Sequence, residues 1–107
     1  MGKKEIRQNF RNVCLKRDKY KCVKCTFKST PDKAEEELDV HHITNRNELP
    51  NGGYVLHNGI SLCNDCHMKA EHFHSTGTAL PGYSVEDLYA AINSTYELAV
   101  IASEKLK

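Results

Sequence analysis

The sequence predicts a small α+β domain in which two short strands lie among helices. Its 107 residues suffice for one domain with a modest core, because a chain of this length buries only about two-thirds of its unfolded surface. Two short strand-like segments, at 38–43 and 59–63, and helical patterns on either side of them favour this class. We therefore expect residues 1–107 to form a single domain with an N-terminal helix and a long C-terminal helix.

The first expected element is a helix over about residues 5–17. Its apolar residues recur at the spacing of one helical face, namely Ile6, Phe10, Val13 and Cys14. The other face is basic: residues 1–28 hold ten Lys and Arg against two acidic residues, a net charge of +8, whereas the rest of the chain carries −7. Such a segment suits a polyanion such as nucleic acid, although a solvated helix face would have the same composition.

The central segment contains both expected strands. Apolar and polar residues alternate over residues 38–43, which predicts a strand, and residues 44–58 read as a loop with a Pro-Asn-Gly-Gly turn at 50–53. A second short strand over 59–63 ends on Cys63. A helix should begin near residue 64 and end before Thr76 and Gly77.

The C-terminal segment predicts one helix over about residues 84–106. Ser84 is a suitable capping residue, and two acidic residues follow it in the first turn. One apolar stripe continues along the segment, formed by Val85, Leu88, Tyr89, Ile92, Tyr96, Ala99 and Val100. The stripe favours packing against the rest of the domain, and a homodimer surface is the alternative.

Four of the five cysteines form two C-x-x-C pairs, Cys22 with Cys25 and Cys63 with Cys66. Two such pairs supply the tetrahedral sulfur set that Zn²⁺ prefers, with no position left open, so we expect a structural zinc that supports the small core. A redox dithiol or two local disulfides are the alternatives. Cys14 is expected to be a buried small hydrophobe.

Neither a signal peptide nor an apolar run long enough to cross a bilayer is evident in the sequence. We therefore expect a cytoplasmic protein without a membrane partner. In a reducing compartment, cysteines serve more often as metal ligands than as disulfides.

The histidines suggest a second metal ion. His41 and His42 are adjacent in a strand and project to opposite faces, while His67 follows the last cysteine on the next helix. If the strand packs against this helix, His41 and His67 meet at one divalent ion and His42 points to a water beside it. Two histidine ligands leave positions open, which is typical of a catalytic site.

The two segments Leu38-Asp-Val-His-His-Ile43 and Asn58-Gly-Ile-Ser-Leu-Cys-Asn-Asp-Cys-His67 resemble the HNH (His-Asn-His) endonucleases, in the branch with four zinc-binding cysteines. The resemblance covers about residues 11–74 and implies the ββα-metal (His-Me finger) fold. It also implies hydrolysis of DNA phosphodiester bonds to 5′-phosphate and 3′-hydroxyl ends, by nicking or cutting.

The resemblance also implies roles for individual residues. His41 and His67 would hold a catalytic Mg²⁺, Mn²⁺, Ni²⁺ or Zn²⁺, and His42 would be the general base. Asn58 would either fix the loop and orient the base or ligate the metal.

Other residues near this motif have two interpretations each. Glu71 is a third ligand, a group that orients His67, or an exposed acid. His72 and His74 are each an extra ligand or a cation that suits the end of a helix. Arg17 and Arg46 are candidate phosphate contacts or surface charges.

The alternative function class is a non-catalytic zinc ribbon that binds nucleic acid or a protein. It explains the four cysteines and the basic segment. It does not require His41, His42, Asn58 and His67 together, and this combination favours the nuclease.

Overall fold

The computed structural model describes residues 2–106 and builds the molecule around one pair of strands. β1 (Asp39–His42) and β2 (Gly59–Leu62) pair antiparallel, with His41 opposite Ile60. Between them lie three short 3₁₀ segments, η1 (Arg46–Glu48), η2 (Pro50–Gly53) and η3 (Leu56–Asn58). The expected strands and the connecting loop are therefore present.

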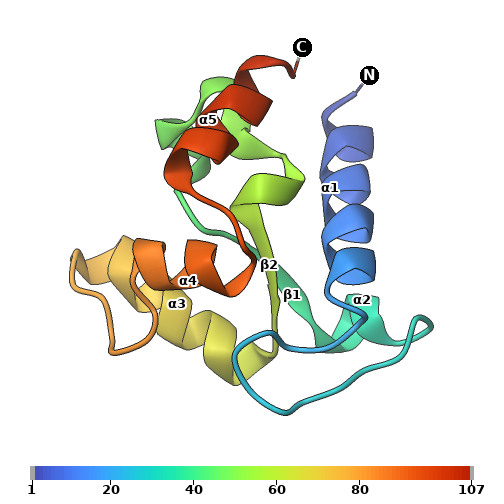
Figure 1. Cartoon of the computed structure of the whole chain (residues 1–107). Helices are drawn as coiled ribbons and strands as arrows, with labels where there is room; N and C mark the ends of the chain where they lie inside the picture. Colours follow the sequence, from blue (N-terminus) through green and yellow to red (C-terminus); the bar gives the residue numbers. More distant parts are fainter. Residues whose placement is uncertain (1, 107) are drawn as a thin grey trace.

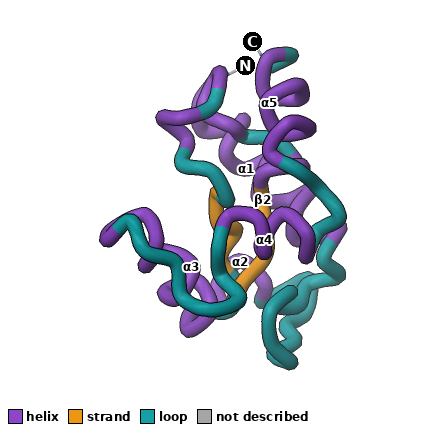
Figure 2. Tube along the Cα trace, turned by 60° about the vertical axis from the view of Figure 1, so that its left-hand side comes forward, coloured by secondary structure: helices purple, strands orange, loops and turns teal. Residues whose placement is uncertain are grey.

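Helices cover both faces of this strand pair (Figures 1 and 2). α1 (Lys3–Arg17) packs on one face and α3 (Asn64–Thr76) on the other, and the short α2 (Ala34–Glu37) leads into β1. The order β1, β2, α3 is the expected ββα arrangement in an α+β fold. None of the helices in the described part of the chain has the length and apolar character of a membrane span.

α1 approaches β2 closely because residue 59 is glycine. A Cβ atom there would lie 2.8 Å from the Phe10 ring and would also overlap the Cys14 sulfur. Phe10 and Cys14 are buried as expected, with Cys14 fully enclosed, whereas Val13 is 38% exposed and lies off the packed face. Any side chain at position 59 would push the helix away from the strand.

The C-terminal segment differs from the expected single helix. It forms α4 (Val85–Ala91) and α5 (Tyr96–Glu104), separated by a turn at which Asn93 adopts a φ of 56°. The side chain of Thr95 then accepts a hydrogen bond from the Leu98 amide and starts the second helix. The apolar stripe continued through this turn in the sequence, so periodicity alone missed the break.

The expected cap at Ser84 is present as a reciprocal capping box with Asp87. From the apolar stripe, Leu88, Tyr89 and Ala99 are buried in the core, whereas Tyr96 is 46% exposed. The core that they join also contains Leu38, Ile43, Ile60 and Leu62.

Candidate functional site

The four paired cysteines converge at one end of the strand pair. Cys63 precedes α3 and Cys66 lies in its first turn, while Cys22 and Cys25 come from the loop after α1. Their sulfur atoms all lie within 4.8 Å of one another, and the Cys25 and Cys63 sulfurs are 3.6 Å apart. Four sulfurs at 2.3 Å from one ion would be separated by about 3.8 Å, so this cluster fits a single tetrahedral metal.

The surroundings of the cysteine cluster also suit a bound cation. All five cysteines are free thiols, so neither local disulfide is formed. The hydroxyl of Tyr83 donates to the Cys66 sulfur at 3.3 Å, and the amide of Phe27 donates to the Cys25 sulfur at 3.5 Å. Burial raises the pKa of the Cys66 thiol to about 12, so a positive ion is needed to hold it as a thiolate.

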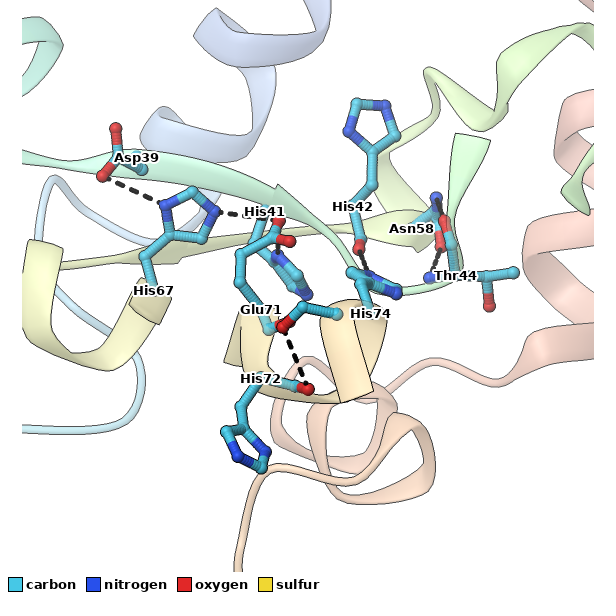
Figure 3. Close-up of polar contacts among 10 residues, drawn as sticks. Asp39, His41, His42, Thr44, Asn58, His67, Glu71, His72 and His74 are labelled. Atoms are coloured by element: carbon cyan, nitrogen blue, oxygen red, sulfur yellow. Dashed lines mark hydrogen bonds and ion pairs between the residues drawn. The ribbon is translucent and has the colours of Figure 1, made fainter. Parts of the chain in front are cut away.

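A second cluster lies where β1 faces α3, around a cavity of about 280 Å³. β1 contributes His41, and one face of α3 contributes His67, Glu71 and His74 at positions i, i+4 and i+7. Figure 3 shows these side chains turned toward one another between the strand and the helix. The rings of His41 and His67 lie near each other, with centroids 5.3 Å apart, whereas the donor atoms within 4.8 Å of one another belong to His41, Glu71 and His74.

Glu71 lies between the two histidines. Its Oε1 is 3.3 Å from His41 Nδ1 and 3.4 Å from His67 Nε2. His41 is 2% exposed, and its Nδ1 has no hydrogen-bond partner. An unpaired buried nitrogen beside a carboxylate and further imidazoles fits a cation better than an empty space.

Two further residues complete this cluster, namely Asp39, for which the sequence predicted no role, and His74, which is a candidate ligand in the sequence. Donor atoms of His41, Glu71 and His74 lie within 4.8 Å of one another, and Nε2 of His74 is 3.2 Å from the His42 carbonyl. Asp39 Oδ2 lies 3.2 Å from His67 Nδ1, which leaves Nε2 of this ring toward the cavity. Asp39 lies two residues before His41 on the same face of β1, and His74 follows His67 by seven residues on the same face of α3. The spacing alone therefore predicts that both side chains lie beside the cavity.

His72 lies apart from this cluster. Its Nδ1 is 2.9 Å from the carbonyl of Thr78, in the loop after α3, and Figure 3 shows the ring turned away from the cavity. The expectation that it serves as an extra ligand is not supported by this position. The helical period explains the difference, because residue 72 is only one position from Glu71 and faces another side of α3.

His42 points to the opposite face of the strand pair from His41, as adjacent strand residues must. Its ring stacks on Phe10 of α1 with centroids 4.7 Å apart and meets the edge of Tyr54 at 5.0 Å. The residue nevertheless borders the same cavity, where its carbonyl lies 3.2 Å from His74 Nε2, and its own Nε2 is buried without a partner. Burial, aided by the charges of Arg46 and His74, lowers the pKa of His42 to about 4, so the ring is neutral at pH 7.

Asn58 is fully buried and uses its whole amide to hold the loop between the strands. Its Oδ1 accepts from the Thr44 amide at 2.9 Å and from the Tyr89 hydroxyl at 2.8 Å. Its Nδ2 donates to the carbonyls of Thr44 at 3.1 Å and Gly53 at 3.2 Å. Of the two expected roles, this geometry favours fixing the loop over binding a metal.

The two candidate phosphate contacts have different environments. Arg17 donates twice to the carboxylate of Asp18 and also to the carbonyls of Leu56 and Gly59, so its guanidinium braces the fold and the expected phosphate contact is not supported. Arg46 lines the histidine cavity and donates to the Tyr54 hydroxyl at 3.2 Å. Only Arg46 is therefore placed to meet an anion there.

Comparison with protein families identifies this arrangement. Residues 22–73 match the family model described as HNH endonuclease. The chain carries an HNH domain. The match begins at the first cysteine of the sulfur cluster and includes both strands and most of α3. This assigns the HNH segment a nuclease-type fold and confirms the resemblance seen in the sequence.

The HNH match ends before His74 and before α4 and α5. The histidine cavity and the loop held by Asn58 nevertheless depend on residues beyond this boundary, namely His74 and Tyr89. Searches of curated proteins and of solved structures found no match to the chain.

Proposed function

We propose that this protein is a metal-dependent HNH endonuclease that hydrolyses phosphodiester bonds in DNA. The observation that carries the proposal is the convergence of His41, His67 and Glu71 on a cavity that His42 also lines. A mixed set of nitrogen and oxygen donors that leaves room for other ligands is typical of a catalytic metal site. His74 is a further candidate ligand from the same helix face.

His42 is the proposed general base. Its neutral ring and unpartnered Nε2 can accept a proton from a water molecule. Stacking on Phe10 and the edge of Tyr54 fixes the plane of the ring, so the lone pair keeps one direction. Asn58 acts as a positioning residue, because it holds the loop that carries Arg46.

The proposed reaction is a balanced hydrolysis. The oxygen of water bonds to phosphorus while one of its protons passes to His42, which later releases it to solvent, and the bond from phosphorus to the 3′ oxygen breaks. The leaving oxygen takes a proton from solvent, which gives a 5′-phosphate and a 3′-hydroxyl. When bound, a divalent metal at this site supplies positive charge for the phosphate and the departing oxygen.

The cysteine cluster has a separate proposed role as a structural zinc site. Four sulfur donors fill a tetrahedral ion completely and leave no position for substrate. The zinc would hold the N-terminal end of α3, from which His67 and Glu71 project.

Nicking of supercoiled plasmid DNA in the presence of Mg²⁺, Mn²⁺, Ni²⁺ or Zn²⁺ tests the function. We expect nicking by the wild type, loss of about 10²-fold or more in His42→Ala, and near-normal rates in His72→Ala. DNA binding without nicking at any metal would show instead a non-catalytic zinc module. Equal nicking by His42→Ala would refute His42 as the general base.

A further inference from the structure

A second cavity, of about 720 Å³, lies between α1 and the end of α5. The start of α1 and the end of α5 lie at the same end of the molecule, and the two helices face each other there (Figures 1 and 2). We call this cavity the basic cleft, after the cationic residues Lys3, Arg7, Arg46 and Lys105 that line it with Tyr54. Arg46 also lines the histidine cavity, which makes it common to both spaces.

The basic cleft holds four positive charges without an opposing one. No Asp or Glu is among its lining residues, and none of the four cations forms an ion pair within residues 2–106. By contrast, Arg11 and Arg17, farther along α1, are both paired with carboxylates. Like charges held in one concave site repel one another, and a bound anion relieves that repulsion.

Tyr54 joins the basic cleft to the proposed base. Its hydroxyl accepts a hydrogen bond from Arg46 at 3.2 Å, while its ring contacts His42 edge-on at 5.0 Å. Burial raises the pKa of this hydroxyl, but the hydrogen bond from Arg46 and the positive charges of Arg46 and Arg7 outweigh it and lower the pKa. The two arginines are therefore gathered around one tyrosine that also touches His42.

The opposite wall of the basic cleft is also fixed. Asn51, in a left-handed conformation with φ of 55°, donates through Nδ2 to the carbonyls of Ser103 and Leu106. These bonds flank Lys105 and tie the end of α5 to the loop between the strands. The cleft is therefore built from three distant parts of the chain that are held by named contacts.

We propose that the basic cleft binds the phosphodiester backbone of the DNA strand whose neighbouring phosphate enters the histidine cavity. The choice of DNA as ligand rests on the proposed function. Arg46 is common to both cavities, so one strand can contact both without leaving the surface. Contacts of this kind carry charge and register but no sequence information, so this site raises affinity for any sequence.

Fluorescence anisotropy with a labelled DNA duplex tests this site. The zinc-loaded protein is titrated without any added divalent metal, at several salt concentrations, so that no hydrolysis is needed. We expect Arg7→Gln and Lys105→Gln each to weaken binding several-fold and to lower the salt slope by about 0.7–0.9, the loss of one phosphate contact. Lys33→Gln, an exposed cation outside the cleft, is the matched control and should change binding less than about 1.5-fold.

Three results would overturn the proposal. Both cleft variants could bind with wild-type affinity and slope, or the Lys33 control could lose as much as they do. Displacement of the DNA by millimolar mononucleotide at constant ionic strength would assign the cleft to a small ligand instead. A protein that binds DNA through the cleft but never nicks plasmid would leave this proposal standing and refute only the nuclease function.

Discussion

The cysteine cluster and the histidine cavity lie on the same helix but differ in every chemical respect. Cys66 and His67 are consecutive residues of α3, yet one is 4% exposed among four sulfurs and the other faces an open cavity. Four sulfur donors would complete the coordination shell of one metal ion, whereas the imidazole and carboxylate donors of the cavity would leave coordination positions open for other ligands. On α3, a single residue step therefore separates the group proposed to hold a structural zinc from the group proposed to act on substrate.

The largest expected effect concerns the cysteine cluster. Cys63→Ser removes a sulfur donor and should abolish tight zinc binding together with cooperative unfolding, because metal affinity in such a site is also folding free energy. Metal analysis after dialysis and a thermal melt followed by circular dichroism measure both. His67→Ala, one residue past Cys66, should keep the zinc and the melting transition.

A Cys63→Ser protein that melts as cooperatively as the wild type would break this comparison. It would mean that the core alone stabilises the fold.

An intermediate effect is expected at Glu71. Glu71→Gln keeps the size of the side chain but removes the charge between His41 and His67, so we expect nicking to fall about 10- to 100-fold with little change in melting temperature. Titration with Mn²⁺ by calorimetry should show weaker binding in parallel. His72→Ala, on another face of α3, is the control.

If Glu71→Gln kept the activity and Mn²⁺ affinity of the wild type, Glu71 would be an exposed acid with no role in metal binding. A large loss in His72→Ala would contradict the division of α3 into a cavity face and an outer face.

The smallest expected effect concerns Tyr83, whose hydroxyl donates to the Cys66 sulfur. Tyr83→Phe removes this bond, worth about 0.5–1 kcal/mol, and should speed transfer of zinc to a chromogenic chelator two- to fivefold. Nicking by the zinc-loaded variant should not change, since Tyr83 does not line the histidine cavity. Tyr96→Phe, at an exposed site, is the control and should leave both rates unchanged. Faster zinc release from Tyr96→Phe would show that the effect of Tyr83→Phe does not come from its hydrogen bond to Cys66.

Local spacing was enough to predict the features that depend on few residues. The C-x-x-C pairs, the alternation around His41 and the helix after Cys63 are fixed by short periods, and the structure forms all of them. The capping residue at Ser84 was likewise visible. Each of these elements is determined by residues that lie within a few positions of one another in the sequence.

Features that depend on competition between partners could not be predicted in this way. Arg17 was a candidate phosphate contact, but the adjacent Asp18 and two carbonyls from the distant loop take its donors. The turn at Asn93 depends on a left-handed residue that an apolar period does not reveal. The position of His74 near the end of α3 left two interpretations open, a ligand or a cation at the helix end, and its angle around the helix decides that it faces the cavity.

The hydrogen bond from Tyr89 to Asn58 has a consequence for how this HNH unit can be moved or reused. Tyr89 lies in α4, beyond residues 22–73, yet its hydroxyl is bonded to the buried amide that braces the loop before β2 and to Thr44 at 2.7 Å. A transplanted segment that stopped at the family boundary would leave this amide oxygen short of a partner. The portable unit therefore has to include α4, and a host protein that supplies its own flanking helix must also supply a hydroxyl at this point.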